Sequence, residues 1–355
     1  MVRDVEHRFP GQIRMNRPHD LPALATLSAR IGADPLLIQG AGGNTSVKDG
    51  DVMWIKASGT NLADALTRDV FVPCDLPAMR AAMTAGEARA DRPAEFALQA
   101  GGLRPSIETS LHAVFPQRVV VHVHCVNTLA LAIRRDAGPA LAARLAGFNW
   151  AMVPYAKPGA NLAAQVLAVL SPGVDVVILR NHGLIVAAES VEEAEALLSR
   201  IVTAVTAPAL SLPADPALAS RADEAYAPLP DDHPLHTVAR TPRLMQAALA
   251  GTLYPDHVVF CGVSAHALRE AETPTQTAAR IVAQGLPQPA FLLVPGLGAL
   301  IRRDATAGAL ALTRCLGDVL SRLAEGAVVT PLTDAQNAEL LDWDAEKYRQ
   351  VLNAG

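Results

Sequence analysis

The chain has 355 residues, of which 50% are hydrophobic and 18% charged, and its formal net charge is −5 at pH 7. This apolar content excludes a wholly disordered chain, and the acidic balance argues against a dedicated nucleic-acid-binding protein. No run of about 18 uncharged apolar residues occurs, and residues 1–10 lack the apolar core of a secretory signal, so we expect no membrane span. Four dispersed cysteines without a Cys-x-x-Cys pair indicate reduced thiols and a cytoplasmic location.

The first half of the sequence alternates helical patterns with short β segments. Residues 19–32 predict a helix that Asp20 caps. Residues 44–48 and 51–57 alternate around an Asp-Gly pair and predict a β-hairpin. Further elements follow, with a helix at 105–116, strands at 118–124, 174–179 and 184–187, and a capping-box helix that starts after Ser190 and covers 191–205.

The second half contains a weak internal repeat. Residues 207–234 are rich in Pro and Ala without apolar periodicity, which predicts a linker. Two pairs of segments then align in the same order, 115–123 with 254–262 and 180–194 with 295–309. The first pair reads as a Val-rich strand after an aromatic-Pro pair, and the second as a strand–Gly–strand unit that leads into a helix. We therefore expect residues 235–330 to be a degenerate repeat of residues 1–206, followed by a helical tail at 331–355.

The sharpest chemical feature is the pair His122 and His124 in a predicted strand. Side chains at i and i+2 leave the same face of a strand, so these imidazoles can share one ion, although a pair of buried, hydrogen-bonded histidines is the alternative. His182 lies in an Asn-His-Gly turn between two apolar strands, where it either faces a cleft or is merely solvated. Three histidines with an open fourth position are typical of a catalytic rather than a structural zinc site.

A carboxylate lies close to these histidines in the sequence. Glu108 stands near a helix start just upstream of the His-x-His strand, and it is a candidate general base beside a metal. The alternative is a carboxylate that only stabilises the helix terminus. His112 follows at i+4, but we interpret it as a supporting or core side chain, because HEXXH-type sites need two histidines at that spacing.

Two glycine-containing segments, GAGGNTS at 40–46 and KASGT at 56–60, precede these residues. The first is neither a dinucleotide fingerprint nor a phosphate loop, because Thr45 stands at the third glycine position and no Gly-Lys-Ser/Thr follows. Backbone N–H groups beside hydroxyl and amide side chains suit a phosphate or a carboxylate, and an ordinary tight turn is the alternative for each segment.

These motifs together resemble the class II aldolase/adducin family over about residues 20–205. The matching pieces, in the order and at the spacing of that family, are GAGGNTS, KASGT, SIETSLH (106–112), HVH (122–124), PYAKPG (154–159) and NHG (181–183). The resemblance implies a three-layer α/β/α fold with a mixed, largely antiparallel sheet. It also implies a divalent ion, zinc first and manganese or cobalt as alternatives, on His122, His124 and His182, with Glu108 as the acid/base that can contact the resting ion.

The resemblance implies substrate contacts as well. The residues expected to bind the substrate or its phosphate are Asn44, Thr45, Ser46, Lys56, Ser58, Gly59 and Ser106. Tyr155 matches the usual proton donor to the aldehyde oxygen. Members commonly form cyclic tetramers with sites between subunits, so we expect a homo-oligomer that takes a small carbonyl substrate, phosphorylated or not.

The second half departs from a plain single-domain member. In the repeat alignment the three histidines fall on Cys261, Val263 and Leu297, so this copy is expected to be metal-free and structural. The arrangement resembles the aldolase portion of bifunctional aldolase/short-chain dehydrogenase chains. Because the sequence carries no dinucleotide fingerprint, we expect no dehydrogenase activity.

The activity expected from this resemblance is that of a divalent-metal-dependent aldehyde-lyase. It would cleave a sugar phosphate or a hydroxy-keto acid reversibly, through an enediolate that the metal stabilises. A dehydratase, decarboxylase or 4-epimerase of a sugar acid or sugar phosphate is the alternative, although epimerase relatives typically carry an aspartate where this chain has Glu108. An adducin-like structural role is disfavoured because the candidate metal ligands are present.

Overall fold

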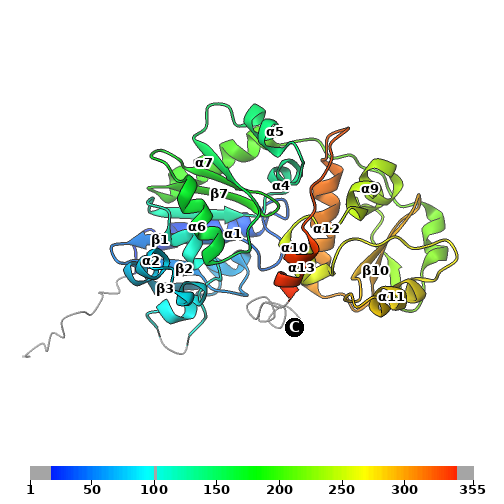
Figure 1. Ribbon diagram of the computed structural model, residues 1–355, viewed down its shortest axis with the longest axis horizontal. Helices are drawn as coiled ribbons and strands as arrows, with labels where there is room; N and C mark the ends of the chain where they lie inside the picture. The colour runs from blue at the N-terminus through cyan, green and yellow to red at the C-terminus, as the bar shows by residue number, and fades with distance from the viewer. Residues whose placement is uncertain (1–16, 100–101, 342–355) are drawn as a thin grey trace, which may run out of the picture.

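The computed structural model describes residues 17–99 and 102–341, which form two halves lying side by side (Figure 1). The first half holds a large sheet, and the second half, coloured from yellow-green to red, holds a small one. Among the described residues, every helix is too short or too polar to cross a lipid bilayer.

The large sheet has seven strands in the order β3-β2-β1-β4-β7-β6-β5. Their bounds are β1 Asn44–Asp49, β2 Val52–Lys56, β3 Phe71–Asp75, β4 Val119–Val123, β5 Trp150–Val153, β6 Val176–Leu179 and β7 Gly183–Ala188. Neighbouring strands are antiparallel except for β5 and β6, which are parallel. This confirms the mixed, largely antiparallel sheet, and β1 and β2 form the predicted hairpin.

Helices cover both faces of this sheet and complete the three α/β/α layers. On one face lie α1 (Leu21–Gly32), α5 (Ala137–Arg144) and α7 (Val191–Val205), and on the other α2 (Leu76–Thr84), α3 (Thr109–Ala113) and α6 (Ala160–Val169). Helix α4 (Val126–Ala132) lies toward the second half, and three short 3-10 helices span Leu62–Leu66, Ala88–Asp91 and Pro93–Phe96. The capping box of Ser190 and Glu193 at the start of α7 is present as predicted.

The alternation of side chains along β4 determines which residues can reach a site on either face. Val119, Val121 and Val123 pack with α1 and α7. Val120 packs on the opposite face with α3 and α6, and His122 shares this face because side chains alternate along a strand. Residues that act together with His122 must therefore lie on the face of the sheet that α3 covers.

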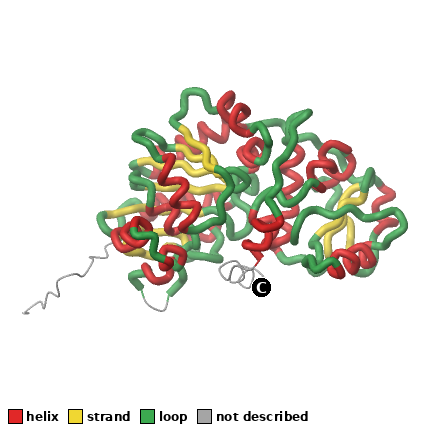
Figure 2. Tube along the Cα trace, viewed as in Figure 1, coloured by secondary structure: helices red, strands yellow, loops and turns green. Residues whose placement is uncertain are grey.

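The second half builds a three-stranded antiparallel sheet with the order β8-β10-β9 (Figure 2). Its elements are a 3-10 helix at Pro216–Arg221, β8 Tyr226–Pro228, α8 Pro234–Arg240, α9 Pro242–Leu249, α10 Pro255–Cys261, α11 Pro274–Ala283, β9 Phe291–Val294, β10 Gly298–Arg302, α12 Ala307–Ser321 and α13 Asp334–Leu341. Val126, Leu129 and Ile133 of the first half share one apolar cluster with Leu235 and Leu316 of the second. The two halves therefore have a continuous core between them.

The prediction of a linker over residues 207–234 is wrong for its second part, which contains a strand. Residues Tyr226–Pro228 form β8 and pair with β10. The side chain of Tyr226 is fully buried, and its hydroxyl donates a hydrogen bond to the Pro289 carbonyl at 2.7 Å. A strand of three residues is too short to show an alternating pattern, which is why composition alone indicated a linker.

The repeat alignment is wrong at its first segment. Residues 254–262, expected to match the strand at 115–123, form α10 instead. Pro255 occupies the start of this helix, and Gly262, with φ of 94°, ends it. Periodicity alone cannot distinguish a helix from a strand in so short an apolar run. The second aligned pair does share its local structure, because each copy is a hairpin that leads into a 15-residue helix.

Two smaller expectations concern the chain ends. Asp20 does not cap α1 through its side chain, since its carboxylate instead pairs with Arg118. The predicted tail begins with α13, whereas the rest of the LLDWDAEKYRQVL segment, from residue 342 onward, lies outside the described residues, as does the N-terminal segment 1–16.

Candidate metal centre and active site

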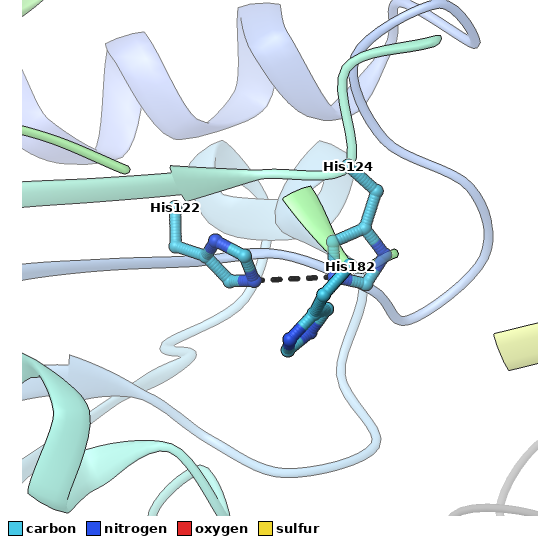
Figure 3. Close-up of side chains that lie close together, drawn as sticks. All are labelled: His122, His124 and His182. Atoms are coloured by element: carbon cyan, nitrogen blue, oxygen red, sulfur yellow. Dashed lines mark hydrogen bonds between the residues drawn. The ribbon is translucent and has the colours of Figure 1, made fainter. Parts of the chain in front are cut away.

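His122 and His124 leave the same face of β4 and point toward each other (Figure 3). His122 is the fourth residue of the strand, and His124 follows its last residue. Their Nε2 atoms lie 3.2 Å apart, and their ring centroids are separated by 5.0 Å. The i and i+2 spacing thus brings two ring nitrogens to one point, as the sequence predicted.

His182 reaches the same point from the turn between β6 and β7. Its ring centroid lies 5.0 Å from that of His122 and 5.2 Å from that of His124. The residue that adopts the left-handed backbone in this turn is Asn181, with φ of 54°. Gly183 is required for a different reason, since a Cβ there would lie 2.6 Å from the Val123 carbonyl oxygen and 2.9 Å from the His122 ring. Glycine therefore allows the turn to approach the two other histidines closely.

Glu108 completes this group from the residue preceding α3. Its Oε1 lies 3.4 Å from His182 Nε2, and its Oε2 lies 3.6 Å from His122 Nε2. The side chain of Asn44 donates a hydrogen bond from Nδ2 to Oε2 at 2.6 Å. Asn44 pairs with His122 in the sheet, so the ladder between β1 and β4 holds this amide beside the carboxylate.

Burial sets the charge states of these groups. Burial lowers the pKa of the His122 imidazole, and it lowers the pKa of His182 to about 3, so both rings are neutral near pH 7. For Glu108, burial raises the pKa, but attraction to the surrounding histidines in their protonated form outweighs burial and lowers the pKa to about 2, so the carboxylate stays ionised after the rings have lost their protons. Neutral imidazoles beside an ionised carboxylate are the protonation states that a divalent metal requires of its ligands.

The donor set fits a divalent cation. The three histidines can offer ligand atoms that all lie within 4.8 Å of one another, and all three side chains are buried. Glu108 Oε1 is also buried and has no hydrogen-bond partner among the described residues. A buried carboxylate that faces three imidazole nitrogens is stabilised when a positive ion lies between them.

A comparison with known families agrees with this geometry. The model of the class II aldolase and adducin N-terminal domain matches residues 23–207, which is more than half of the chain. The chain belongs to the class II aldolase and adducin family. Its matched region contains the whole seven-stranded sheet and all three histidines.

Three similar proteins place the aldolase-like half in context. An uncharacterized oxidoreductase, YuxG of Bacillus subtilis (strain 168), is 28% identical over 203 residues, which is 53% of this chain but only 29% of that protein. The N-terminal class II aldolase domain of a conserved Thermoplasma acidophilum protein is 28% identical, with 56% of this chain and 97% of that chain covered and a TM-score of 0.48. An L-fuculose-1-phosphate aldolase from Thermus thermophilus is 20% identical, with 51% and 91% covered and a TM-score of 0.35.

A small cavity lies against the three-histidine group of this class II aldolase domain. Five of the residues expected to bind substrate line it, namely Asn44, Lys56, Ser58, Gly59 and Ser106, together with Glu108, His124 and His182. The cavity offers about 20 Å³ of free space, close to what one or two waters occupy.

Lys56 and the glycine-rich segment form one wall of this cavity. Lys56 is buried, and its Nζ donates hydrogen bonds to the carbonyls of Ala41 at 2.7 Å and Gly43 at 3.0 Å. A Cβ at Gly42 would lie 2.9 Å from His124 Nδ1. The glycines therefore let this loop lie against the His124 ring, and Lys56 holds the loop in place.

The predicted roles of Thr45 and Ser46 in substrate binding are corrected by the structure. Thr45 faces the opposite side of the sheet, where its hydroxyl shares a 2.7 Å hydrogen bond with Ser28 of α1. Ser46 shares the face of Asn44, but its hydroxyl bonds His112 Nδ1 at 2.7 Å, and both side chains are fully buried. Neither residue lines the cavity. The alternation of side chains turns Thr45 to the opposite face of the sheet, and Ser46 lies two residues beyond Asn44 along β1. His112 is a core side chain outside the three-histidine group, as expected.

Tyr155, the expected proton donor, lies away from the cavity wall. It follows β5 and packs with Val258, Leu332 and Leu340 of the second half. Within the single chain Tyr155 is not among the residues that line this cavity, so its role as proton donor stays a prediction.

Sequence reasoning missed Asp256, which lines the cavity from the second half. Its Oδ2 lies 2.8 Å from His124 Nδ1. The repeat alignment matches this residue with Gln117 in a strand that carries no ligand at that position, and therefore gives it no role in the site. The signal that could have found it is an acidic residue next to a proline at the start of a helix, Pro255-Asp256.

Proposed function

We propose that this protein is a divalent-metal-dependent aldolase that reversibly cleaves a carbon–carbon bond of a small hydroxy-carbonyl compound. The observation that carries the proposal is the Glu108 carboxylate, which lies 3.4 Å and 3.6 Å from the Nε2 atoms of His182 and His122. An ionised carboxylate held in this position can remove a proton from the carbon next to the substrate's carbonyl. Membership in the class II aldolase and adducin family supports the same chemistry.

In the proposed reaction Glu108 transfers the proton and Asn44 orients Glu108. The ion, when bound, supplies Lewis-acid stabilisation of negative charge that develops on the substrate oxygens. Glu108 accepts the proton on the carbon next to the carbonyl and returns it in the reverse direction. Asn44 holds Oε2 by its hydrogen bond, which leaves Oε1 to face the cavity. Fixing the base in this way avoids the cost of ordering it in the transition state.

The polar wall of the cavity suits an anionic end of the substrate. Ser58, Gly59 and Ser106 lie along this wall, near the buried ammonium of Lys56. We propose that they hold a phosphate or a carboxylate there, while the carbonyl end of the substrate faces the histidines. Hydroxyls and backbone N–H groups next to a cation are common partners for such anions.

Three further points of the proposal rest on the family likeness. Among zinc, manganese and cobalt, zinc is the ion that three histidines and one carboxylate suit best. A homo-oligomer would bring additional residues to the cavity from a neighbouring subunit. Tyr155 is proposed as the proton donor to the aldehyde oxygen, which requires either its loop to move or a second copy of the chain to supply it, given where it packs.

The proposal is tested by product analysis of metal-replete protein. The protein is incubated with dihydroxyacetone phosphate or with pyruvate, each with a panel of short aldehydes. The products are then separated and identified by mass spectrometry. Formation of a new carbon–carbon bond by the wild type, together with its loss in Glu108→Gln, is the expected result. Loss of water or of carbon dioxide, or inversion of a hydroxyl without a change in carbon count, would instead identify a dehydratase, a decarboxylase or an epimerase.

A further inference from the structure

Asp256 brings the second half of the chain into contact with the metal centre. It belongs to the first turn of α10, and its Oδ2 lies 2.8 Å from Nδ1 of His124. Both side chains are buried, with exposed fractions of 6% and 8%. A carboxylate oxygen at this distance from a buried ring nitrogen interacts with it electrostatically, and water does not weaken the contact.

The contact is on the far side of the His124 ring from the metal centre. His124 Nε2 lies 3.2 Å from His122 Nε2, which is the side where the three imidazoles converge. A carboxylate beside Nδ1 favours the tautomer that keeps its proton on Nδ1, so that the neutral ring presents an unprotonated Nε2 to an ion. His122 follows the same pattern, since its Nδ1 lies 3.1 Å from the Leu184 carbonyl oxygen.

The position of α10 is fixed by contacts that also involve the turn of the third histidine. Asn181, the neighbour of His182, donates hydrogen bonds from its side-chain amide to the carbonyls of Leu253 at 2.9 Å and Thr330 at 2.8 Å. Leu253 stands two residues before α10. The loop that carries His182 and the segment that carries Asp256 are thus bound to each other across the two halves.

From these contacts we propose that Asp256 is a positioning residue for the metal ligand His124, and that the second half of the chain is therefore a working part of the metal centre. Asp256 fixes the tautomer and the orientation of the His124 ring and makes its Nε2 a stronger ligand. This inference rests on the proposed metal centre but not on the reaction carried out there. Removal of such carboxylate partners typically lowers metal affinity by about 10- to 100-fold.

The experiment compares the wild type with Asp256→Asn and Asp256→Glu in the full chain. Cobalt(II) is titrated into metal-free protein, and both the dissociation constant and the visible absorption spectrum are recorded. Asn keeps the size of the side chain but not its charge, so we expect about 10- to 100-fold weaker cobalt binding and an altered spectrum. Glu keeps the carboxylate, and we expect it to recover part of the affinity.

Asp318→Asn serves as the matched control. Asp318 is a buried aspartate of the same half, but it pairs with Arg322 at the end of α12 and belongs neither to the three-histidine group nor to the residues that line the cavity. This variant should reproduce the wild-type cobalt spectrum and affinity. Because Asn can also loosen the fold, thermal unfolding of each metal-free variant is measured to verify that the chain is folded.

Each outcome decides between the claims. Wild-type affinity and spectrum in Asp256→Asn would overturn the positioning role, while the proposed function would stand. An altered cobalt site in a protein that forms no carbon–carbon bond would overturn the proposed function and leave the role of Asp256 intact. Failure of the wild type to bind cobalt at all would overturn both.

Discussion

Asn44 and Glu108 share a 2.6 Å hydrogen bond, from the amide Nδ2 to the carboxylate Oε2, across 64 residues of sequence. Asn44 also pairs with His122 in the ladder between β1 and β4. One strand pairing therefore places the orienting amide beside both the candidate base and a candidate metal ligand.

Substitution Asn44→Ala tests this orienting role. Loss of the hydrogen bond frees the Glu108 carboxylate to rotate, so we expect the rate of carbon–carbon bond formation to fall by about 10- to 100-fold. Bound metal should remain, since Asn44 is not one of the three histidines. The measurement is steady-state turnover of metal-replete protein together with metal analysis.

Thr45→Val is the matched control for this variant. Thr45 is the next residue of β1 but faces Ser28 on the other side of the sheet, so its loss should cost only about 1 kcal/mol of stability. Turnover in Thr45→Val should equal that of the wild type. Equal losses in the two variants would show that Asn44 acts through the stability of the strand rather than through Glu108.

Glu108→Gln tests the base itself. The amide has nearly the same shape but cannot accept the proton, so exchange of the proton next to the carbonyl should slow by about 10²- to 10⁴-fold. Exchange is followed by NMR in deuterated water with dihydroxyacetone phosphate or pyruvate as substrate. An unchanged exchange rate with metal still bound would assign the base to another residue.

Gly183→Ala tests the close approach of the His182 turn to β4. The new Cβ would lie 2.6 Å from the Val123 carbonyl oxygen and 2.9 Å from the His122 ring, so the turn must shift away. We expect a loss of about 1–3 kcal/mol of stability and at least about 10-fold weaker zinc binding. Gly138→Ala is the control, because the nearest atom to its Cβ is Met152 Cε at 3.8 Å, and there zinc binding should be unchanged.

Buried His257 predicts a pH dependence of stability. Burial, aided by His266, lowers the pKa of His257 in the folded chain from 6.5 to about 4. Between these values the unfolded chain binds the proton more readily, so the free energy of unfolding falls as the pH falls from 6.5 toward 4. The difference between these two pKa values corresponds to about 3 kcal/mol of unfolding free energy for this one group.

His257→Leu should remove that share of the acid sensitivity. Urea unfolding of metal-free protein in EDTA at pH 7 and at pH 4 should show a loss about 3 kcal/mol smaller in the variant than in the wild type. His19→Leu, at an exposed position, should lose as much as the wild type. If His257→Leu loses as much unfolding free energy between pH 7 and pH 4 as the wild type does, the folded chain accommodates the charged His257 ring.

The first half shows how far local sequence patterns can predict a fold and a site. The alternation around Asp49-Gly50 predicted the hairpin, and the i and i+2 spacing predicted the convergence of His122 and His124. The same alternation could have corrected the role of Thr45, because adjacent residues of one strand face opposite ways. A family motif names residues without saying which of them face the site.

The second half shows what local patterns cannot decide. The Val-rich run at 254–262 fits a strand or a buried helix equally well, and only its partners in the fold select the helix. Asp256 meets His124 through that helix, across 132 positions of sequence that no spacing rule connects. The role of Tyr155 likewise depends on how loops pack against the second half.

The central claim is that His122, His124 and His182 hold one divalent cation. Equilibrium dialysis of metal-free protein against zinc, for the wild type and for the variants His122→Ala, His124→Ala and His182→Ala, tests it most directly. We predict one tightly bound zinc per chain in the wild type and a loss of binding of at least about 100-fold in each variant. Zinc that binds the variants as tightly as the wild type, or a wild type that binds none, would contradict the account.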